Sequence, residues 1–315
     1  MATVRLTTRS LLLLIAIIFM VTYALMSVAT GMIKNSNEVA TMQHKYTGNQ
    51  QISVIIMNYG RPRVLQQSNL LPVLTSHEHV DEVLLLHASD ATKFEYKHPK
   101  VRNIDAVKEN EEIGLAIRFQ FCDTHVKEEN EWVLIVDDDM EFEAATLTEV
   151  LVEFSKNPNR IVGKWARKLL PFSNSPLTFY GYNSITVSGQ AEVVLTKFMM
   201  MQQTICKAFA DHSHLVFDDI IKSYPKPLWN GEDIFMSLVA NHLYSQGHSN
   251  NYGMPWLNVW ETKYSRDEIG ISGNVRGVQP WNQGWWKDLA QMCSHYRYRG
   301  LLWREGRKRL INNGR

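Results

Sequence analysis

The sequence predicts an α/β domain behind one N-terminal membrane-spanning helix. Residues 11–29 are apolar and uncharged, and the body alternates short apolar runs with segments of helical periodicity. The 315 residues include 33 Lys and Arg against 32 Asp and Glu, and 45% are apolar, a composition typical of folded chains. The formal net charge of +1 provides no global field for nucleic acid, so nucleic-acid binding is not expected.

Residues 11–29 (LLLLIAIIFMVTYALMSVA) are predicted to be a signal anchor. As a helix this run would be about 29 Å long, which matches the hydrocarbon core of a bilayer. Arg5 and Arg9 precede it, and only Lys34 follows closely, so residues 1–10 are expected in the cytoplasm. This predicts a single-pass type II protein of the Golgi or ER membrane. A cleaved signal peptide is the alternative, because Ser27-Val28-Ala29 resembles a cleavage site.

The polar, aperiodic residues 30–50 are predicted to form a stem, and residues 51–315 a single lumenal domain. The three cysteines, Cys122, Cys206 and Cys293, are too few for a disulfide scaffold and allow at most one bridge. The region therefore needs a hydrophobic core of its own.

Within this domain, strands are predicted at 53–57, 82–86 and 132–136, and helices at 63–74, 113–125 and 146–154. The strands are short and almost continuously apolar, which indicates burial on both faces of a parallel sheet. Alternating strands and helices predict a doubly wound α/β sheet, in which ligands bind beyond the carboxyl ends of the strands.

Three carboxylates, Asp137, Asp138 and Asp139, directly follow the strand at 132–136. Such a concentration of negative charge suits a hard divalent cation, and alternate residues can point into one cleft. A metal there could neutralise a departing diphosphate. The alternative is a solvated acidic turn that begins the next helix.

Glu232 and Asp233 form a second acidic pair, at the start of a segment whose apolar residues recur at helical spacing. Asn230 would be the N-cap of this helix. Acids in a first helical turn are stabilised by the helix dipole, so capping and catalysis remain equally open interpretations.

Three blocks, in this order, resemble the exostosin C-terminal domain, glycosyltransferase family 64, over Ile52 to Cys293. They are VLIVDDDM, then RIVGKWARKLL (Arg160 to Leu170), then WNGEDIFMSLVANHL (Trp229 to Leu243). The resemblance implies a GT-A fold with a metal-binding DxD motif at the end of a strand. It also implies retaining transfer from a UDP-sugar or GDP-sugar with Mn²⁺, Mg²⁺ being possible, to a glycan, glycolipid or protein acceptor.

By the same resemblance, Asp139 looks like the direct metal ligand, and Asp137 and Asp138 look like contacts to the ribose and donor sugar, with Asp137 also near the metal. Arg61 and Arg118 are implied in donor binding. A surface ion pair is the common alternative for a single arginine.

Asp233 matches the acid that the family places under the reacting sugar, and Glu232 matches the acid before it. A carboxylate there would stabilise oxocarbenium character at the anomeric carbon. The alternative enzyme is an inverting transferase in which one of these acids serves as general base.

The sequence departs from the family pattern at two positions. Gly231 stands where a cysteine is common, so a bridge from there to Cys293 cannot form, and Ala290 stands where an arginine is common. The role of that arginine is unassigned or has moved to Arg297 or Arg299. These departures leave open a catalytically silent protein that binds nucleotide sugars or glycans.

Overall fold

The computed structural model describes residues 50–59, 62–156, 158–163, 166–167, 169–171, 178–180, 189–190, 193–216, 231–247, 256–257, 305–306, 308–310 and 312. The chain divides into two compact units, Met1–Gly48 and Asn49–Arg315, and every described residue belongs to the second unit. The predicted tail and anchor therefore lie outside the described residues. Within the ranges given above, no helix is long and apolar enough to cross a membrane.

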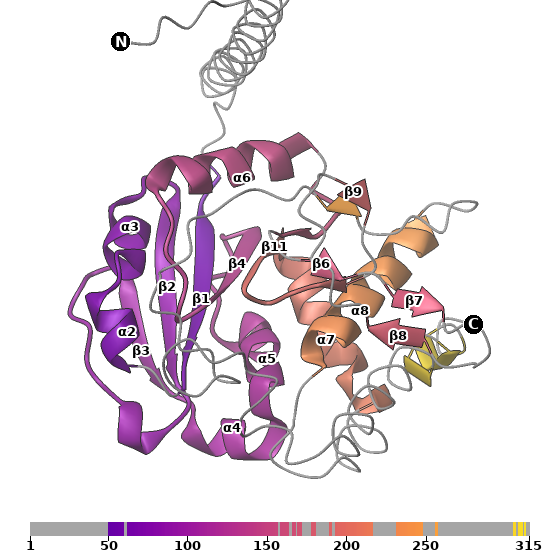
Figure 1. Cartoon of the computed structure of the whole chain (residues 1–315), viewed down its shortest axis with the longest axis horizontal. Coiled ribbons are helices and arrows are strands. Elements are labelled where there is room, and N and C mark those ends of the chain that lie inside the picture. The colour runs from indigo at the N-terminus through magenta and orange to yellow at the C-terminus, as the bar shows by residue number, and fades with distance from the viewer. Residues whose placement is uncertain are drawn as a thin grey trace, which may run out of the picture. The chain divides into compact units, whose positions relative to one another are not determined.

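A six-stranded mixed sheet forms the centre of the described part of the second unit (Figure 1). Its strands, in spatial order, are β3 (Val101–Asp105), β2 (Val80–His87), β1 (Ile52–Asn58), β4 (Trp132–Asp137), β11 (Phe198–Gln202) and β5 (Val162–Gly163). The first four run parallel, and β11 and β5 add antiparallel pairings at one side. The predicted mainly parallel α/β sheet is confirmed.

The chain order of the strands reverses beside β1. β2 and β3 follow β1 on one side, whereas β4 pairs with its other side. Open α/β sheets bind ligands at such a switch point, beyond the carboxyl ends of the strands. The functional site is therefore expected where β1 and β4 end.

Helices cover both faces of the sheet. Their bounds are α2 (Pro62–Gln67), α3 (Leu70–Ser76), α4 (Val107–Ile113), α5 (Ile117–Thr124), α6 (Ala144–Lys156), α7 (Gln203–Val216) and α8 (Glu232–Gly247). α5 packs against β1 and α7 against β4 and β11. On the other face, Phe154 of α6 meets Trp132 of β4 edge-on, with 4.9 Å between ring centroids.

Alternate residues of each strand lie on opposite faces of the sheet, because successive side chains of a strand point to opposite sides. Ile55, Val133 and Met199 belong to the core cluster that contains α5, α7 and α8. The predicted strands at 53–57, 82–86 and 132–136 are all present. The sequence did not predict β3, which has exposed polar residues, or β11, whose methionines are buried but carry no strong strand preference.

Two predicted helices have different bounds in the structure. The helix expected at 63–74 is two helices, broken at Ser68 and Asn69. The hydroxyl of Ser68 donates to the carbonyl of Leu65 and accepts from the amide of Leu70, which competes with helical bonding. Pro72 has no amide hydrogen and fits only the first turn of the second helix. The helix expected at 113–125 begins with a 3₁₀ turn (Gly114–Ala116), and α5 itself starts at Ile117.

Short strand pairs surround the main sheet: β6 (Ala166–Arg167) with β10 (Val193–Val194), β7 (Leu169–Pro171) with β8 (Thr178–Tyr180), and β9 (Gly189–Gln190) with β12 (Trp256–Leu257). Gly163 on β5 lies where this region meets the sheet. A Cβ at Gly163 would overlap the side chain of Val194 and come within 2.8 Å of the carbonyl oxygen of Phe198. Glycine is therefore required there by close packing.

Candidate active site at the carboxyl edge of the sheet

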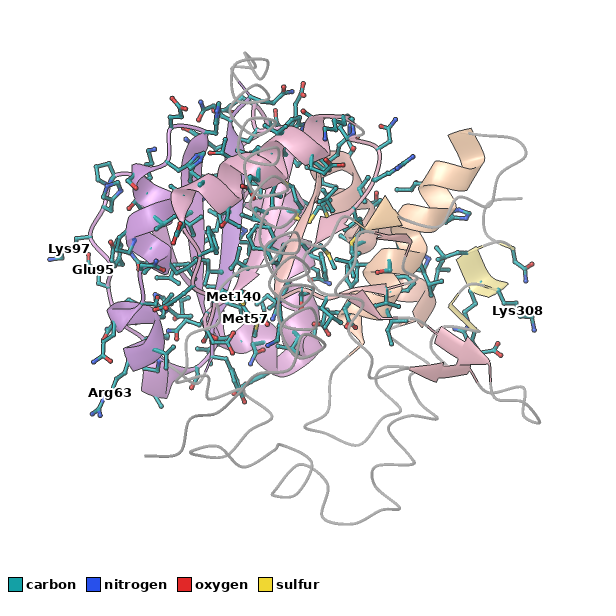
Figure 2. The ribbon with its side chains drawn as sticks, turned by 45° about the horizontal axis from the view of Figure 1, so that its top comes forward. Met57, Arg63, Glu95, Lys97, Met140 and Lys308 are labelled. Atoms are coloured by element: carbon teal, nitrogen blue, oxygen red, sulfur yellow. A yellow bond between two sulfur atoms is a disulfide. The ribbon has the colours of Figure 1, made fainter. Side chains whose placement is uncertain are left out.

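The acid triplet lies at the switch point of the sheet. β4 ends at Asp137, which is in register with Met57 of β1, and Asp138 and Asp139 form the turn that follows. Asp138 is 1% exposed and Asp139 3% exposed. Figure 2 labels Met57, near the end of β1, and Met140, the residue directly after this turn. The alternative of a solvated acidic turn is wrong for Asp138 and Asp139, because both are buried.

Arg118, on α5, forms a buried ion pair with the first of these acids. Its Nη1 donates to Oδ1 of Asp137 at 2.8 Å, and its Nη2 lies 3.6 Å from the sulfur of Met57. Burial lowers the pKa of Arg118, but the carboxylates of Asp137, Glu232 and Asp138 together hold the pKa above its usual value. The guanidinium is thus a permanent positive charge inside the site. The alternative of a surface ion pair is wrong for this arginine, because it is only 3% exposed.

Glu232 and Asp233 are buried at the start of α8, at 5% and 6% exposure. Gly231, directly before them, has a φ of 124°, a conformation that favours glycine. Its amide donates to Oε2 of Glu232 at 3.0 Å, and the amide of Ile234 donates to Oδ1 of Asp233 at 2.8 Å. Both acids therefore accept bonds from backbone amides at the helix start, as the capping interpretation predicts. Asn230, the predicted N-cap, lies outside the described residues.

Burial and, to a smaller extent, the charge of Asp233 raise the pKa of Glu232, and Arg118 partly offsets both effects, so that the resulting pKa is about 7. The hydroxyl of Thr196 also lies 3.4 Å from Oε1 of Glu232. Because Arg118 and Glu232 act on each other, the acids of α8 and the turn after β4 belong to one electrostatic cluster. A carboxyl with a pKa near neutrality in such a cluster is typical of a functional site.

The carboxylate oxygens of this cluster are suited to a hard divalent cation that is bound partly by the protein and partly by a phosphate-containing ligand. Carboxylates outnumber the arginine in this cluster, so the cluster has excess negative charge that a divalent cation would balance. Among the residues that the structure describes, however, no three His, Cys, Asp or Glu side chains are arranged to hold an ion by themselves. Mg²⁺ is usually bound in proteins through one or two carboxylates, with water and substrate phosphates as further ligands.

Several residues named in the sequence analysis lie outside the part of the chain that the structure describes. Arg61, Ala290, Cys293, Arg297 and Arg299 fall outside the described residues. His87 is a buried residue at the end of β2, and its ring nitrogens lie 3.0 Å from Asn58 Nδ2 and 3.3 Å from Asn103 Oδ1.

The described residues of the basic stretch near the C-terminus, 305–306, 308–310 and 312, are partly packed. Arg309 donates to the carbonyl of Leu215 at the end of α7, at 2.7 Å. Leu310 is 2% exposed and belongs to the core. This stretch therefore helps to close the end of α7.

The sequence did not predict the disulfide between Cys122 on α5 and Cys206 on α7, whose Cα atoms are 5.8 Å apart. Spacing along the chain carried no signal for it, since 84 positions separate the two cysteines. Thr196 was also missed, because a threonine in a short turn has no distinguishing pattern.

A pocket of about 530 Å³ lies at the opposite, amino edge of the sheet, lined by residues that include Asp81, Asn130 and Glu131. Asp81 there forms an ion pair with Lys127 and accepts a bond from Asn130. This pocket is away from Arg118 and the acid triplet, so it provides control positions for testing the site.

The model of the glycosyl transferase family 64 domain matches residues 52–283. No curated protein sequence matches the chain. Among solved structures, the 4-diphosphocytidyl-2C-methyl-D-erythritol synthase of Anaerococcus prevotii aligns at 12% identity and a TM-score of 0.40, covering 70% of this chain and 91% of that chain.

Two further solved structures align with a similarly low sequence identity and TM-score. S. aureus TarS aligns at 13% identity and a TM-score of 0.37, covering 61% of this chain and 55% of that chain. The mannosyltransferase PcManGT of Pyrobaculum calidifontis, in complex with GDP-Man and Mn²⁺, aligns at 11% identity and a TM-score of 0.40, covering 75% of this chain and 64% of that chain. The chain thus spans less than two thirds of these two proteins. Likeness at this level carries no functional argument.

Proposed function

The chain belongs to glycosyl transferase family 64 and is a glycosyltransferase, and we propose that it is a metal-dependent, retaining enzyme with a GT-A fold. It moves a hexose or N-acetylhexosamine from a UDP-sugar or GDP-sugar to a glycan, glycolipid or protein acceptor. The observation that carries this proposal is the buried electrostatic cluster at the switch point, where Arg118 of α5 is paired with Asp137 and acted on by Glu232 of α8.

The two signs of charge in this cluster suit the two parts of a nucleotide-sugar donor. Arg118 is a buried, permanent cation that favours a diphosphate, and its contact with Asp137 keeps it at the end of β4. Asp139 and Asp137 would hold Mn²⁺, with Mg²⁺ possible, and Asp138 would contact the ribose and donor sugar. The metal, when bound, supplies positive charge that stabilises the departing diphosphate.

The two acids at the start of α8, Glu232 and Asp233, are proposed to act on the donor sugar. Departure of a diphosphate from an anomeric carbon creates oxocarbenium character, which a buried carboxylate stabilises. Asp233 is the proposed group beside the anomeric carbon, and Glu232 is the second candidate. NMR of the product distinguishes this reaction from an inverting one, since retention of the anomeric configuration supports the proposal and inversion would make one of the acids a general base.

The decisive experiment measures nucleotide release by the purified full chain in detergent, with a panel of UDP- and GDP-sugars and acceptors, in Mn²⁺ or chelator. We expect metal-dependent release from one donor, abolished by Asp139→Asn without loss of fold. Asp81→Asn, which removes an equivalent charge at the amino edge of the sheet, is the matched control and should remain active. Full activity in chelator contradicts the metal, and nucleotide binding without turnover on any donor and acceptor indicates a silent binding protein.

The chain is further proposed to be a type II protein of the Golgi or ER membrane, anchored by residues 11–29. A disulfide between Cys122 and Cys206 supports the lumenal placement, because disulfides persist in oxidising compartments. Protease treatment of intact microsomes tests it. A tag after Arg315 should be protected until detergent is added, and a tag cleaved in intact vesicles would contradict the placement.

A further inference from the structure

The position of Arg118 depends on how α5 is held. α5 has eight residues and follows a 3₁₀ turn that begins at Gly114, which has a φ of 60°. A two-turn helix is not stable by itself, so tertiary contacts must orient it. Both of the contacts described next join α5 to α7.

The first contact is an aromatic stack. The ring of Phe119, the residue after Arg118, lies 4.6 Å from the ring of Phe209 on α7. The second is the Cys122–Cys206 disulfide, which is fully buried. Cys122 lies one helical turn after Arg118, and its sulfur is 4.0 Å from the carbonyl oxygen of Arg118. The covalent link thus meets α5 beside the residue that carries the guanidinium.

α7 also supports the acids on the other side of the site. Phe209 contacts Phe235 of α8 edge-on, with 5.4 Å between ring centroids. Phe235 is two residues after Asp233, in the first turns of a helix that is buried on all sides between positions 231 and 240. One helix therefore supports both the cation of α5 and the acids of α8.

We propose that the Cys122–Cys206 disulfide is a positioning element for catalysis, which holds Arg118 at its working distance from Asp137 and Glu232. This role rests on the proposed function. The bridge links α5 to the same helix that supports α8, so without it α5 can shift relative to the acids while the sheet remains intact. Misplacement of a charged group by about 1 Å can cost about 100-fold in rate.

A double-mutant cycle on the full chain in detergent tests the proposal, combining Cys122→Ser/Cys206→Ser with Arg118→Lys. If the bridge acts through Arg118, its removal lowers kcat/KM about 10- to 100-fold in the chain with Arg118. In the Arg118→Lys chain, the same removal should cost less than about twofold. Equal losses in both backgrounds, or no loss in either, overturn the proposal, because a bridge that only stabilises the fold acts independently of residue 118.

Leu71→Ala is the control for lost stability. Leu71 is fully buried in α3, which packs against β2, so this variant is destabilised and should keep its kcat/KM per folded molecule. If the serine pair fails to fold, Cys122→Ala/Cys206→Val, which refills the space with apolar groups, enters the same cycle.

A second arm needs no catalysis. Arg118→Lys should lower the urea midpoint of unfolding less in the unbridged chain than in the bridged one, because the contact with Asp137 is already loosened there. Equal midpoint shifts overturn the role of the bridge. A wild-type chain that releases nucleotide from no donor instead contradicts the proposed function, so the two failures are distinguishable.

Discussion

Arg118 and Glu232 show how individual side chains acquire their properties from the fold. Both are candidate site residues in the sequence, and burial makes each of them sensitive to its neighbours. Arg118 keeps its charge because three carboxylates favour it, and Glu232 has a pKa near neutrality because burial and Asp233 disfavour its ionised form. Arg118 therefore contributes a permanent positive charge to the site, and Glu232 contributes a charge that changes near pH 7.

The raised pKa of Glu232 predicts a pH-dependent cost in stability. Between its ordinary value of 4.5 and about 7, the folded chain holds a proton that the unfolded chain releases. Its contribution to stability is thus complete below pH 4.5 and is lost as the pH rises through 7. Glu232→Gln stays neutral, so the variant should gain up to about 3 kcal/mol relative to the wild type across this range.

Urea unfolding of both chains at pH 5, 6, 7 and 8 measures this difference. Glu128→Gln, which removes a charge from an exposed position, is the control and should show no such trend. A difference between Glu232→Gln and the wild type that does not change with pH would contradict the prediction.

At the scale of elements, two glycines decide how neighbouring segments meet. Gly231 starts α8 with a positive φ and lies directly before the acid pair. Gly163 lets β5 approach β10 and β11 closely. Both glycines lie in blocks that resemble the family. Only the structure shows that Gly231 is needed for its backbone conformation and Gly163 for close packing.

The two glycines form a matched pair of substitutions. Gly231→Ala should cost about 1–3 kcal/mol, because an L side chain is strained at that φ. Gly163→Ala should cost a similar amount through overpacking. We expect both to lower the urea midpoint, but only Gly231→Ala should also lower kcat at a temperature where both chains are folded. Unchanged kcat in Gly231→Ala would show that the acids do not depend on the start of α8.

At the scale of the whole described unit, one disulfide ties two segments that are distant in the chain. Cys122 and Cys206 enclose β4, the acid triplet and β11, and 84 positions separate the two cysteines. The core on the α5 side of the sheet includes both cysteines and side chains of α5, α7 and α8. The bridge therefore closes a loop that contains the central part of the site.

Closing a loop of this length should stabilise the fold by about 4.5 kcal/mol, through the lower entropy of the unfolded chain. Urea unfolding with and without a thiol reductant measures the effect. We expect a lower midpoint in the reductant, and no such shift in Cys122→Ser/Cys206→Ser. The same midpoint for the wild type in both conditions would mean that the bridge does not form in solution.

Much of the fold was legible in the sequence because burial leaves a local pattern. The apolar runs at 53–57, 82–86 and 132–136 are strands of the sheet, and the helix expected at 146–154 lies within α6. β3 and β11 were missed because one is an exposed edge and the other consists largely of methionine. The break before Pro72 was visible in principle, since proline belongs to a first helical turn.

Part of the candidate site was also predictable from the sequence. The position of Asp137, Asp138 and Asp139 after a buried strand located the carboxyl edge, and the order of strands and helices predicted the α/β class. By itself, then, the sequence determined the fold class, three of the strands and the acids that follow one of them. The tertiary structure alone decided that Arg118 pairs with Asp137, that Glu232 titrates near pH 7, and that Cys122 bonds to Cys206. The physical reason is that periodicity reports which face of an element is buried, whereas ion pairs, pKa shifts and disulfides depend on distances between segments that are remote in the chain.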